Sequence, residues 1–155
     1  MSISCPKRRV EIHTLSSVTL TDQEFLAGSR KEESVVLAGE LRIPGAVAGE
    51  RLPAIVLVHG SGGVLGAIDE WSQLFIEKGI AVFILDSFTG RGTVSTVEDQ
   101  GQLGRLAMIV DIYRALDLLV HHPRISPDKI AVMGFSRGGS GVRDHHAQAG
   151  IVSQK

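Results

Sequence analysis

Residues 129–139 read Lys-Ile-Ala-Val-Met-Gly-Phe-Ser-Arg-Gly-Gly, an apolar run that ends in Gly-x-Ser-x-Gly. A serine hydroxyl is a weak nucleophile at neutral pH, so an enzyme must hold it clear of the neighbouring backbone and beside a general base. A sharp turn from a strand into a helix does this, and it leaves no room for a side chain on either flank. Gly134 and Gly138 meet that demand, because a Cβ at either position would collide with the turned chain. The motif therefore predicts a nucleophile elbow with Ser136 at its tip.

The residues before this motif favour an elbow over a glycine-rich loop. The chain holds 18 glycines, so the string can also arise from composition alone. Residues 130–135, however, form a short run rich in strand-favouring side chains, and the turn-forming segment Ser126-Pro127-Asp128 precedes it. We therefore expect a buried parallel strand that leads into the serine; the alternative is a glycine-rich loop after a core strand.

Length and charge define the broad class of the protein. A chain of 155 residues has the size of one domain, so residues 1–155 are expected to form a single α/β domain. Sixteen Lys and Arg against 17 Asp and Glu provide no basic field for nucleic acid or an anionic membrane surface. Cys5 is the single cysteine, which excludes a disulfide framework and a cysteine-rich metal site. With no signal-peptide segment and no apolar run of about 18 residues, we expect a cytoplasmic protein.

The pattern of apolar residues predicts the order strand, strand, strand, helix, strand, helix, strand. Strands are expected at residues 10–20, 35–43, 54–58, 80–85 and 130–135, and helices at residues 67–78 and 102–121. The continuous apolar run 54–58 indicates a strand covered on both faces. Gly79 is expected to cap the first helix at its C-terminus. Alternating strands and helices in the second half are typical of a mostly parallel sheet with flanking helices.

A second glycine-containing segment, His59-Gly60-Ser61-Gly62-Gly63, directly follows the expected third strand. Together with residues 134–139, this segment resembles the corresponding loops of the α/β-hydrolase superfamily. In that fold the oxyanion hole uses the backbone N–H after the nucleophile and one from the loop after the third strand. The resemblance assigns these two N–H groups to Arg137 and Ser61. Gly60 and Gly62 line the approach to them, and His59 is implied to position the loop.

Within the superfamily, residues 35–140 resemble the dienelactone hydrolase family. The resemblance rests on the elbow and on the loop Asp86-Ser87-Phe88-Thr89-Gly90-Arg91-Gly92. Dienelactone hydrolase proper has a cysteine nucleophile and a glutamate just after the third strand, where this chain has Ser136 and Gly60. The resemblance therefore implies a serine hydrolase that attacks a small-molecule ester or lactone through an acyl-enzyme on Ser136 and needs no cofactor.

Two charged residues of the 86–92 loop are candidates for roles at the site. Arg91 is flanked by glycines and is a candidate to bind a substrate carboxylate; the alternative is a solvated loop arginine. Asp86 ends a strand at the edge where α/β folds build their sites, and it is expected to cap or order its own loop.

Acidic and basic residues recur at every third position of the expected helix 102–121. Asp111, Arg114 and Asp117 follow this spacing among apolar neighbours. The spacing predicts a solvated helix face with ion pairs between successive turns.

Two readings other than a hydrolase remain open. Gly60-x-Gly62 after a strand, with Asp86 at the end of the next strand, imitates a Rossmann-type dinucleotide-binding domain. The fingerprint then requires Gly or Ala at position 65, which is leucine, and this reading leaves the Gly-x-Ser-x-Gly motif unexplained. The other reading is a complete short α/β protein that binds a ligand or partner without catalysis.

The acid and base of the expected catalytic triad are not found. In α/β-hydrolases they follow the nucleophile, but only 19 residues follow Ser136. Asp144 would lie ~12 Å along the elbow helix from Ser136, and the adjacent His145 and His146 diverge on a helix. His13 is expected to stand alone on a strand face, and no His-Glu-x-x-His spacing indicates zinc.

These observations predict an α/β-hydrolase fold without its C-terminal strands. A sheet that ends at strand 130–135 would leave an apolar edge uncovered. We expect self-association through that edge.

Overall fold

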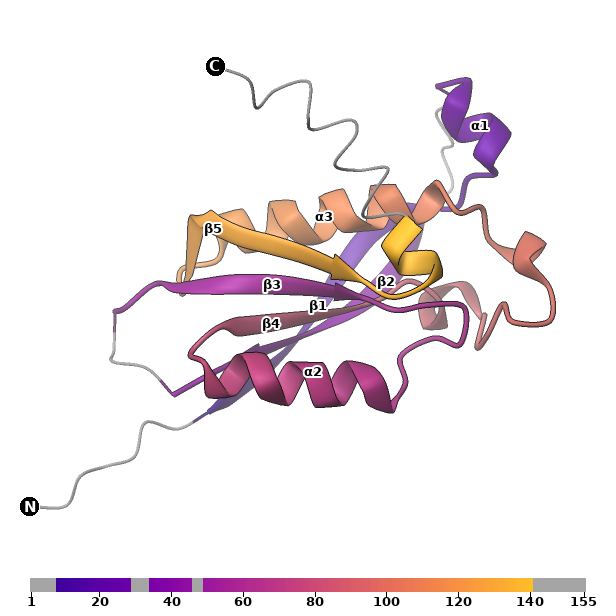
Figure 1. The fold of residues 1–155 in the computed structure, drawn as a ribbon. Helices are drawn as coiled ribbons and strands as arrows, with labels where there is room; N and C mark the ends of the chain where they lie inside the picture. The colour runs from indigo at the N-terminus through magenta and orange to yellow at the C-terminus, as the bar shows by residue number, and fades with distance from the viewer. Residues whose placement is uncertain (1–7, 29–33, 46–48, 141–155) are drawn as a thin grey trace, which may run out of the picture.

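A computed structural model describes residues 8–28, 34–45 and 49–140 (Figure 1). The elements in these ranges are β1 (Arg9–Val18), α1 (Asp22–Leu26), β2 (Ser34–Ile43), β3 (Leu52–Val58), α2 (Gly66–Glu77), β4 (Ala81–Asp86), the short 3₁₀ helices η1 (Thr89–Arg91) and η2 (Gln100–Gln102), α3 (Ala107–His121) and β5 (Ile125–Gly134). Each expected strand and helix is present, with ends that differ by a few residues.

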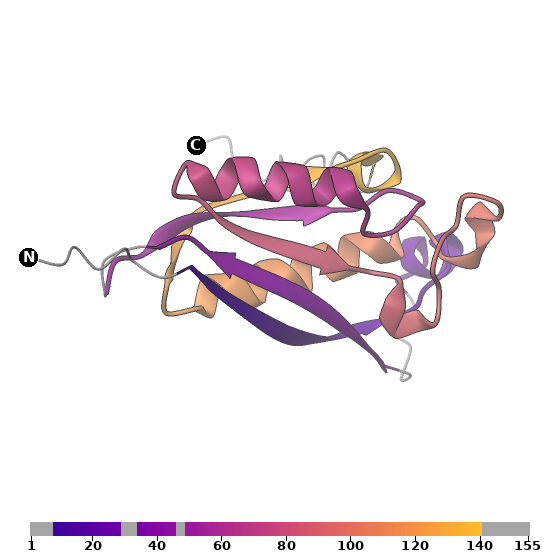
Figure 2. The same ribbon diagram turned by 90° about the horizontal axis from the view of Figure 1, so that it is seen from below.

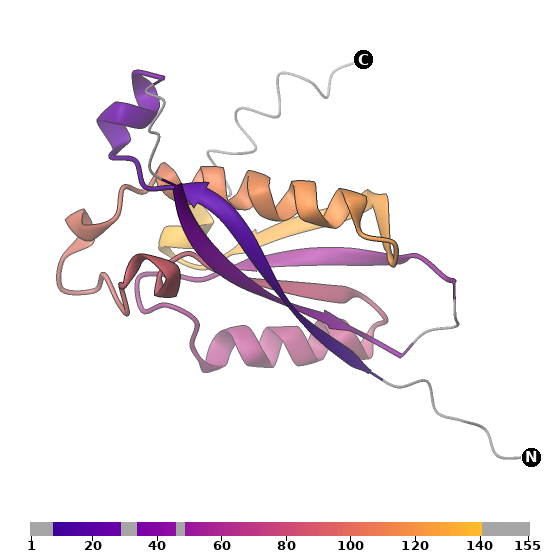
Figure 3. The same ribbon diagram turned by 180° about the vertical axis from the view of Figure 1, so that it is seen from behind.

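The strands form one mixed sheet in the order β1-β2-β4-β3-β5. β3 pairs in parallel with β4 on one side and with β5 on the other. β2 joins β4 in the antiparallel direction, and β1 pairs with β2 in the same way. Figure 3 shows β1 and β2 crossing the view together in front of the parallel strands. The carboxyl ends of β3, β4 and β5 therefore meet at one end of the sheet, where α/β folds build their sites.

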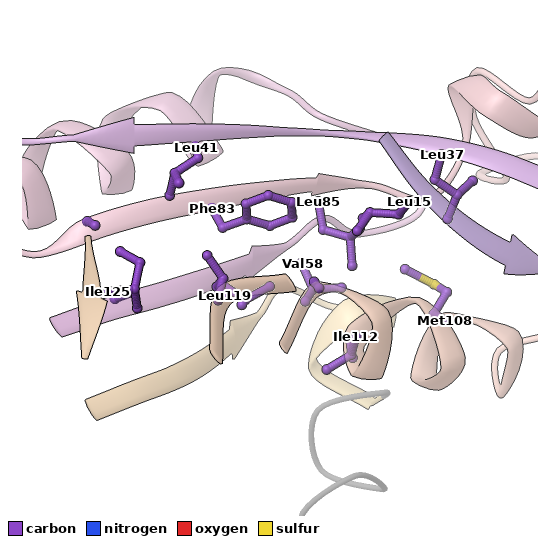
Figure 4. Close-up of a cluster of buried hydrophobic side chains, with 14 of the residues drawn as sticks. Leu15, Leu37, Leu41, Val58, Phe83, Leu85, Met108, Ile112, Leu119 and Ile125 are labelled. Atoms are coloured by element: carbon purple, nitrogen blue, oxygen red, sulfur yellow. The ribbon is translucent and has the colours of Figure 1, made fainter. Parts of the chain in front are cut away.

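Helices cover both faces of the sheet, with α2 on one side and α3 on the other (Figures 1 and 2). Side chains of β3 alternate between the two layers. Ala54, Val56 and Val58 belong to the core with α3, whereas Ile55 and Leu57 belong to the core with α2. Figure 4 shows side chains from the sheet and from α3 meeting in the larger core. The prediction that β3 is covered on both faces is confirmed.

α2 ends just before Gly79, the residue predicted to cap it. Gly79 has a φ of 77°, a left-handed conformation that favours glycine. Its N–H donates to the Ile76 carbonyl, and the N–H of Ile80 donates to the Phe75 carbonyl. These bonds satisfy carbonyl groups that the last turn would leave unpaired.

Several local features differ from the expectations. β5 was expected as a buried strand, but Ile125 is its single buried residue, and residues 126–134 are half-buried or exposed. The polar stretch after β1 contains α1, a five-residue helix with a capping box between Thr21 and Glu24, which is too short to show a period. The helix expected from residue 102 begins at Ala107. The expected turn at residues 126–128 lies within β5, where the pairing jumps from Leu52–Ile125 to Ala54–Ile130 and bulges the strand.

The expected solvated face of α3 is wrong at one position. Asp111 is fully buried, whereas Arg114 and Asp117 are exposed as predicted. Asp111 lies on the row Ala107, Asp111, Ala115, which faces the sheet. The i,i+4 spacing of residues that face the sheet therefore decides the burial of Asp111, and the i,i+3 spacing of the charged residues does not.

β5 pairs with β3 and is the edge strand at that end of the order in the described sheet. Self-association through it stays a prediction. Among the residues placed in the structure, no helix has the length and apolar character needed to span a bilayer.

Candidate active site

Ser136 occupies a sharp turn between β5 and a helical turn that starts at Arg137. The N–H of Phe135 still donates to the Val58 carbonyl of β3, at 3.0 Å. The N–H of Ser140 already donates to the Ser136 carbonyl, at 3.1 Å. Between these two bonds Ser136 adopts a φ of 49°, which is uncommon for a residue other than glycine and costs backbone energy. The strained turn holds an exposed serine at the end of the strand.

The glycines on both flanks of the turn leave no room for side chains, as predicted. A Cβ on Gly134 would lie 2.3 Å from the Gly138 carbonyl oxygen. A Cβ on Gly138 would lie 2.5 Å from the carbonyl oxygens of Val58 and His59. The elbow therefore packs backbone to backbone against itself and against the end of β3.

The glycine loop after β3 lies directly beside Ser136. Gly60 and Gly63 close a tight turn through a 3.1 Å bond from the Gly63 N–H to the Gly60 carbonyl, with Gly63 at a φ of 80°. A Cβ added to Gly60 would lie 3.3 Å from the Ser136 Cβ. Because β3 and β5 are parallel neighbours, Ser61 and Ser136 share one end of the sheet. The structure thus brings together the two segments that the sequence singled out.

The two residues predicted to donate backbone N–H groups, Ser61 and Arg137, are joined by a third side chain. Ser61 Oγ donates to Gln100 Oε1 at 3.0 Å, and Arg137 Nη1 donates to the same oxygen at 2.6 Å. The N–H of Arg137 belongs to the first turn of the elbow helix, where N–H groups have no partner within the helix. Of the other predicted loop glycines, Gly62 lies within the turn, where a Cβ would meet the end of the Leu65 side chain.

His59 is buried and has both ring nitrogens bonded. The N–H of Ser87 donates to His59 Nε2 at 3.1 Å, so the proton of the neutral ring lies on Nδ1, which donates to the Gly60 carbonyl at 2.8 Å. Burial lowers the pKa of His59 below its ordinary value, although the bond to Gly60 opposes the shift. The ring also packs edge-on against Phe88. These contacts connect the glycine loop to the loop after β4.

Asp86 caps its own loop, as expected. Its Oδ1 accepts hydrogen bonds from the N–H groups of Phe88 and Thr89, and its Oδ2 accepts one from Thr89 Oγ1. Burial raises the pKa of the Asp86 carboxyl, but the bonds from Thr89 and Phe88 outweigh it, so the pKa lies below its ordinary value.

Arg91 is neither a solvated loop residue nor free to bind substrate in this structure. Its guanidinium forms a two-pronged ion pair with the buried Asp111, at 2.8 and 2.9 Å. The remaining three N–H groups donate to Thr19 Oγ1 and to the carbonyls of Val18 and Ser87. All five donors are used, so none is left for a substrate carboxylate. Arg91 instead fastens the loop after β4 to β1 and α3.

The expectation that His13 stands alone is wrong, because it contributes to a polar cluster at the other end of β5. Glu11 Oε2 lies 2.9 Å from His13 Nε2 and 3.0 Å from His122 Nε2. The N–H of Arg124 donates to His122 Nδ1. In a neutral ring, Nε2 of His122 then carries the proton and has no lone pair for a metal ion. The cluster reads as a hydrogen-bonded link between β1 and the end of α3.

The candidate acid and bases Asp144, His145 and His146 lie outside the described residues. Within the described part, His121 and His122 end α3 and are separated from Ser136 by the length of β5. His59, whose nitrogens are both bonded, positions the glycine loop and does not face Ser136 as a free base.

The sequence matches a model of the dienelactone hydrolase family over residues 37–153. This chain belongs to the dienelactone hydrolase family. The match includes the glycine loop, the elbow and the strands that carry them. Ser136 and Gly60 both lie within the matched residues.

Several solved structures are similar in fold to this chain. A dienelactone hydrolase-like promiscuous phosphotriesterase from metagenomic libraries is 16% identical, with a TM-score of 0.57, 90% of this chain covered and 55% of that chain. Est1E from Butyrivibrio proteoclasticus is 18% identical, with a TM-score of 0.59 and coverages of 86% and 46%. An esterase from Pyrobaculum calidifontis is 22% identical, with a TM-score of 0.60 and coverages of 95% and 42%.

The chain spans about half the length of these structures. No curated protein sequence matches it. At these identities the solved structures show the fold alone. This fold is that of the α/β-hydrolases, and the Rossmann-type alternative is therefore wrong.

Proposed function

We propose that this chain carries the nucleophile and the oxyanion-binding loops of a serine hydrolase that acts on ester or lactone carbonyls. The observation that carries the proposal is the strained Ser136, at a φ of 49°, with Gly60 against its Cβ. A fold that only stacks helices on a sheet has no need for a serine in this conformation. The membership of the dienelactone hydrolase family supports the same chemistry.

In the proposed reaction, Ser136 Oγ attacks the substrate carbonyl carbon and transfers its proton to a base. The carbonyl oxygen becomes an oxyanion, which accepts hydrogen bonds from the N–H groups of Ser61 and Arg137. Each such donor contributes about 3 kcal/mol to stabilisation of the transition state. The tetrahedral intermediate then expels the alkoxide, which takes up the proton, and an acyl group remains on Ser136. Water, deprotonated by the same base, attacks the acyl group and releases the acid.

The base is proposed to be a histidine beyond the described residues, oriented by an acidic residue in the family order serine, acid, histidine. His59 is excluded from this role by its bonds to Gly60 and Ser87. The proposed partner is a small-molecule ester or lactone.

Hydrolysis of p-nitrophenyl acetate by the purified chain tests the division of roles. A serine without its base keeps at most the residual acceleration from oxyanion and substrate binding, about 10³ to 10⁴ over water. We therefore expect hydrolysis barely above background and little change on Ser136→Ala. Strong turnover that Ser136→Ala abolishes would place a base within residues 1–155 or a second copy of the chain.

Added imidazole acts as a general base from solution. It should increase acetylation of Ser136, mapped by mass spectrometry, over that of Ser140 four residues along. Absence of any acyl adduct on Ser136 in the presence of imidazole would contradict the proposal.

A further inference from the structure

The loop between β4 and α3 contacts both segments that flank Ser136. Gln100, in the 3₁₀ helix η2 of that loop, lies 39 residues from Ser61 and 37 residues from Arg137 along the chain. Its side-chain oxygen accepts a hydrogen bond from Ser61 Oγ at 3.0 Å and from Arg137 Nη1 at 2.6 Å. One amide oxygen therefore joins the loop after β3 to the elbow helix.

Further bonds from the same loop fix each partner of Gln100. Arg137 Nη1 also donates to the Gln100 carbonyl at 3.1 Å, and Arg137 Nη2 donates to the Leu103 carbonyl. The Ser61 carbonyl accepts hydrogen bonds from the N–H of Thr96 at 2.8 Å and from Ser95 Oγ at 3.2 Å. The side chain and the carbonyl of Ser61 are thus both held by residues 95–100, and the Arg137 guanidinium is held by residues 100–103.

We propose that Gln100 is a positioning residue that sets the orientation of the two oxyanion-binding N–H groups. This inference rests on the proposed function of Ser61 and Arg137. Donors stabilise a transition state most when they are held in place before the charge develops, since no reorganisation is then required. The loop after β3 and the elbow helix come from different strands, and Gln100 Oε1 supplies a single acceptor shared by both.

The chemistry of the glutamine side chain suits this task. An amide oxygen has two lone pairs and accepts from both the Ser61 hydroxyl and the Arg137 guanidinium. Leucine of similar size has no acceptor, whereas glutamate retains one and adds an ion pair with Arg137. Gln100→Leu should therefore remove the acceptor that the Ser61 hydroxyl and the Arg137 guanidinium share, and Gln100→Glu should retain it.

Backbone ¹⁵N relaxation of the full 155-residue chain tests the positioning directly and needs no catalysis. In the wild type, the N–H order parameters of Ser61 and Arg137 should match rigid backbone, at about 0.85. Gln100→Leu should lower both, and Gln100→Glu should restore both. Gln102→Leu replaces an exposed glutamine of the same 3₁₀ helix and is the matched control, which should leave both unchanged. Unchanged order parameters in Gln100→Leu, or a drop shared by Gln102→Leu, would overturn the inference.

The rate of Ser136 phosphonylation by a fluorophosphonate separates this inference from the proposed function. The maximal rate constant should fall about tenfold in Gln100→Leu, with the half-saturating probe concentration unchanged, because oxyanion donors act on the transition state. Recovery of the rate in Gln100→Glu supports a positioning role over a general loss of structure. Lower order parameters in Gln100→Leu, without any reaction of Ser136 in the wild type, would support the positioning role of Gln100 and contradict the proposed function. A normal rate constant in Gln100→Leu would overturn the positioning role itself.

Discussion

Arg91 and Asp111 form a buried, two-pronged ion pair that fastens the loop after β4 to α3, with N–O distances of 2.8 and 2.9 Å. The Arg91 side chain is 4% exposed and that of Asp111 is fully buried. Asp111 Oδ1 also accepts a hydrogen bond from Ser17 Oγ of β1. The pair therefore connects three elements at the end of the sheet that carries Ser136.

Removal of one member of this pair should strongly destabilise the fold. Arg91→Gln or Asp111→Asn should lower the free energy of unfolding by about 3 to 5 kcal/mol, because each leaves its partner buried without compensation. Asp117→Asn on the exposed face of α3 is the control, and it should cost at most about 1 kcal/mol. Urea unfolding measures all three. Equal, small losses in Arg91→Gln and Asp117→Asn would show that the pair is not a structural link.

The sequence predicted this region only in part, for a physical reason. The i,i+3 charges of α3 suggested a solvated face, yet Asp111 also lies on the four-residue row with Ala107 and Ala115, and that row faces the core. The spacing of residues along the helix shows that Asp111 belongs to both series. It cannot show which distant residue compensates the charge of its carboxylate. Arg91 supplies it from 20 residues away.

The elbow and the glycine loop were predictable because their signals are local. A glycine where a Cβ would collide with nearby backbone, as at Gly134 and Gly138, marks a tight turn within five residues of sequence. Gln100 had no such signal, since its role depends on contacts with Ser61 and Arg137, which come from other loops. His13 was likewise missed as a partner of Glu11 and His122.

Because Ser136 has a strained backbone, we expect glycine at this position to give a more stable protein than alanine, the reverse of the usual order of stability. Ser136→Ala keeps a Cβ at a φ of 49°, whereas Ser136→Gly removes it, so the glycine variant should be about 1 kcal/mol more stable. At Ser140, within the helical turn, alanine should be the more stable by about the same amount. Thermal unfolding of the four variants measures both differences. If alanine is the more stable residue at both positions, the elbow is not strained.

Burial of His59 predicts loss of stability on mild acidification. Its pKa is lowered in the folded protein by burial, so below about pH 6.5 the unfolded chain binds a proton that the folded chain resists. The stability that this neutral ring contributes is present above that pH and is lost as the pH falls toward the folded-state pKa.

Unfolding free energies at pH 7.5 and pH 5.5 check this expectation. His59→Gln should be less stable than the wild type at pH 7.5 and should lose less stability between the two values. His121→Gln, at an exposed histidine of α3, controls for the removal of one histidine. A wild-type loss no larger than that of His59→Gln would show that His59 is not buried as a neutral ring.

The site at which a fluorophosphonate reacts tests the central claim, that Ser136 is a nucleophile beside two oxyanion-binding N–H groups. Peptide mapping by mass spectrometry after incubation of the 155-residue chain should find the adduct on Ser136 well ahead of Ser140 and Ser61. Ser136→Ala should remove the adduct, whereas Ser140→Ala should retain it. Adducts spread evenly over the serines, or found on others and not on Ser136, would contradict the account.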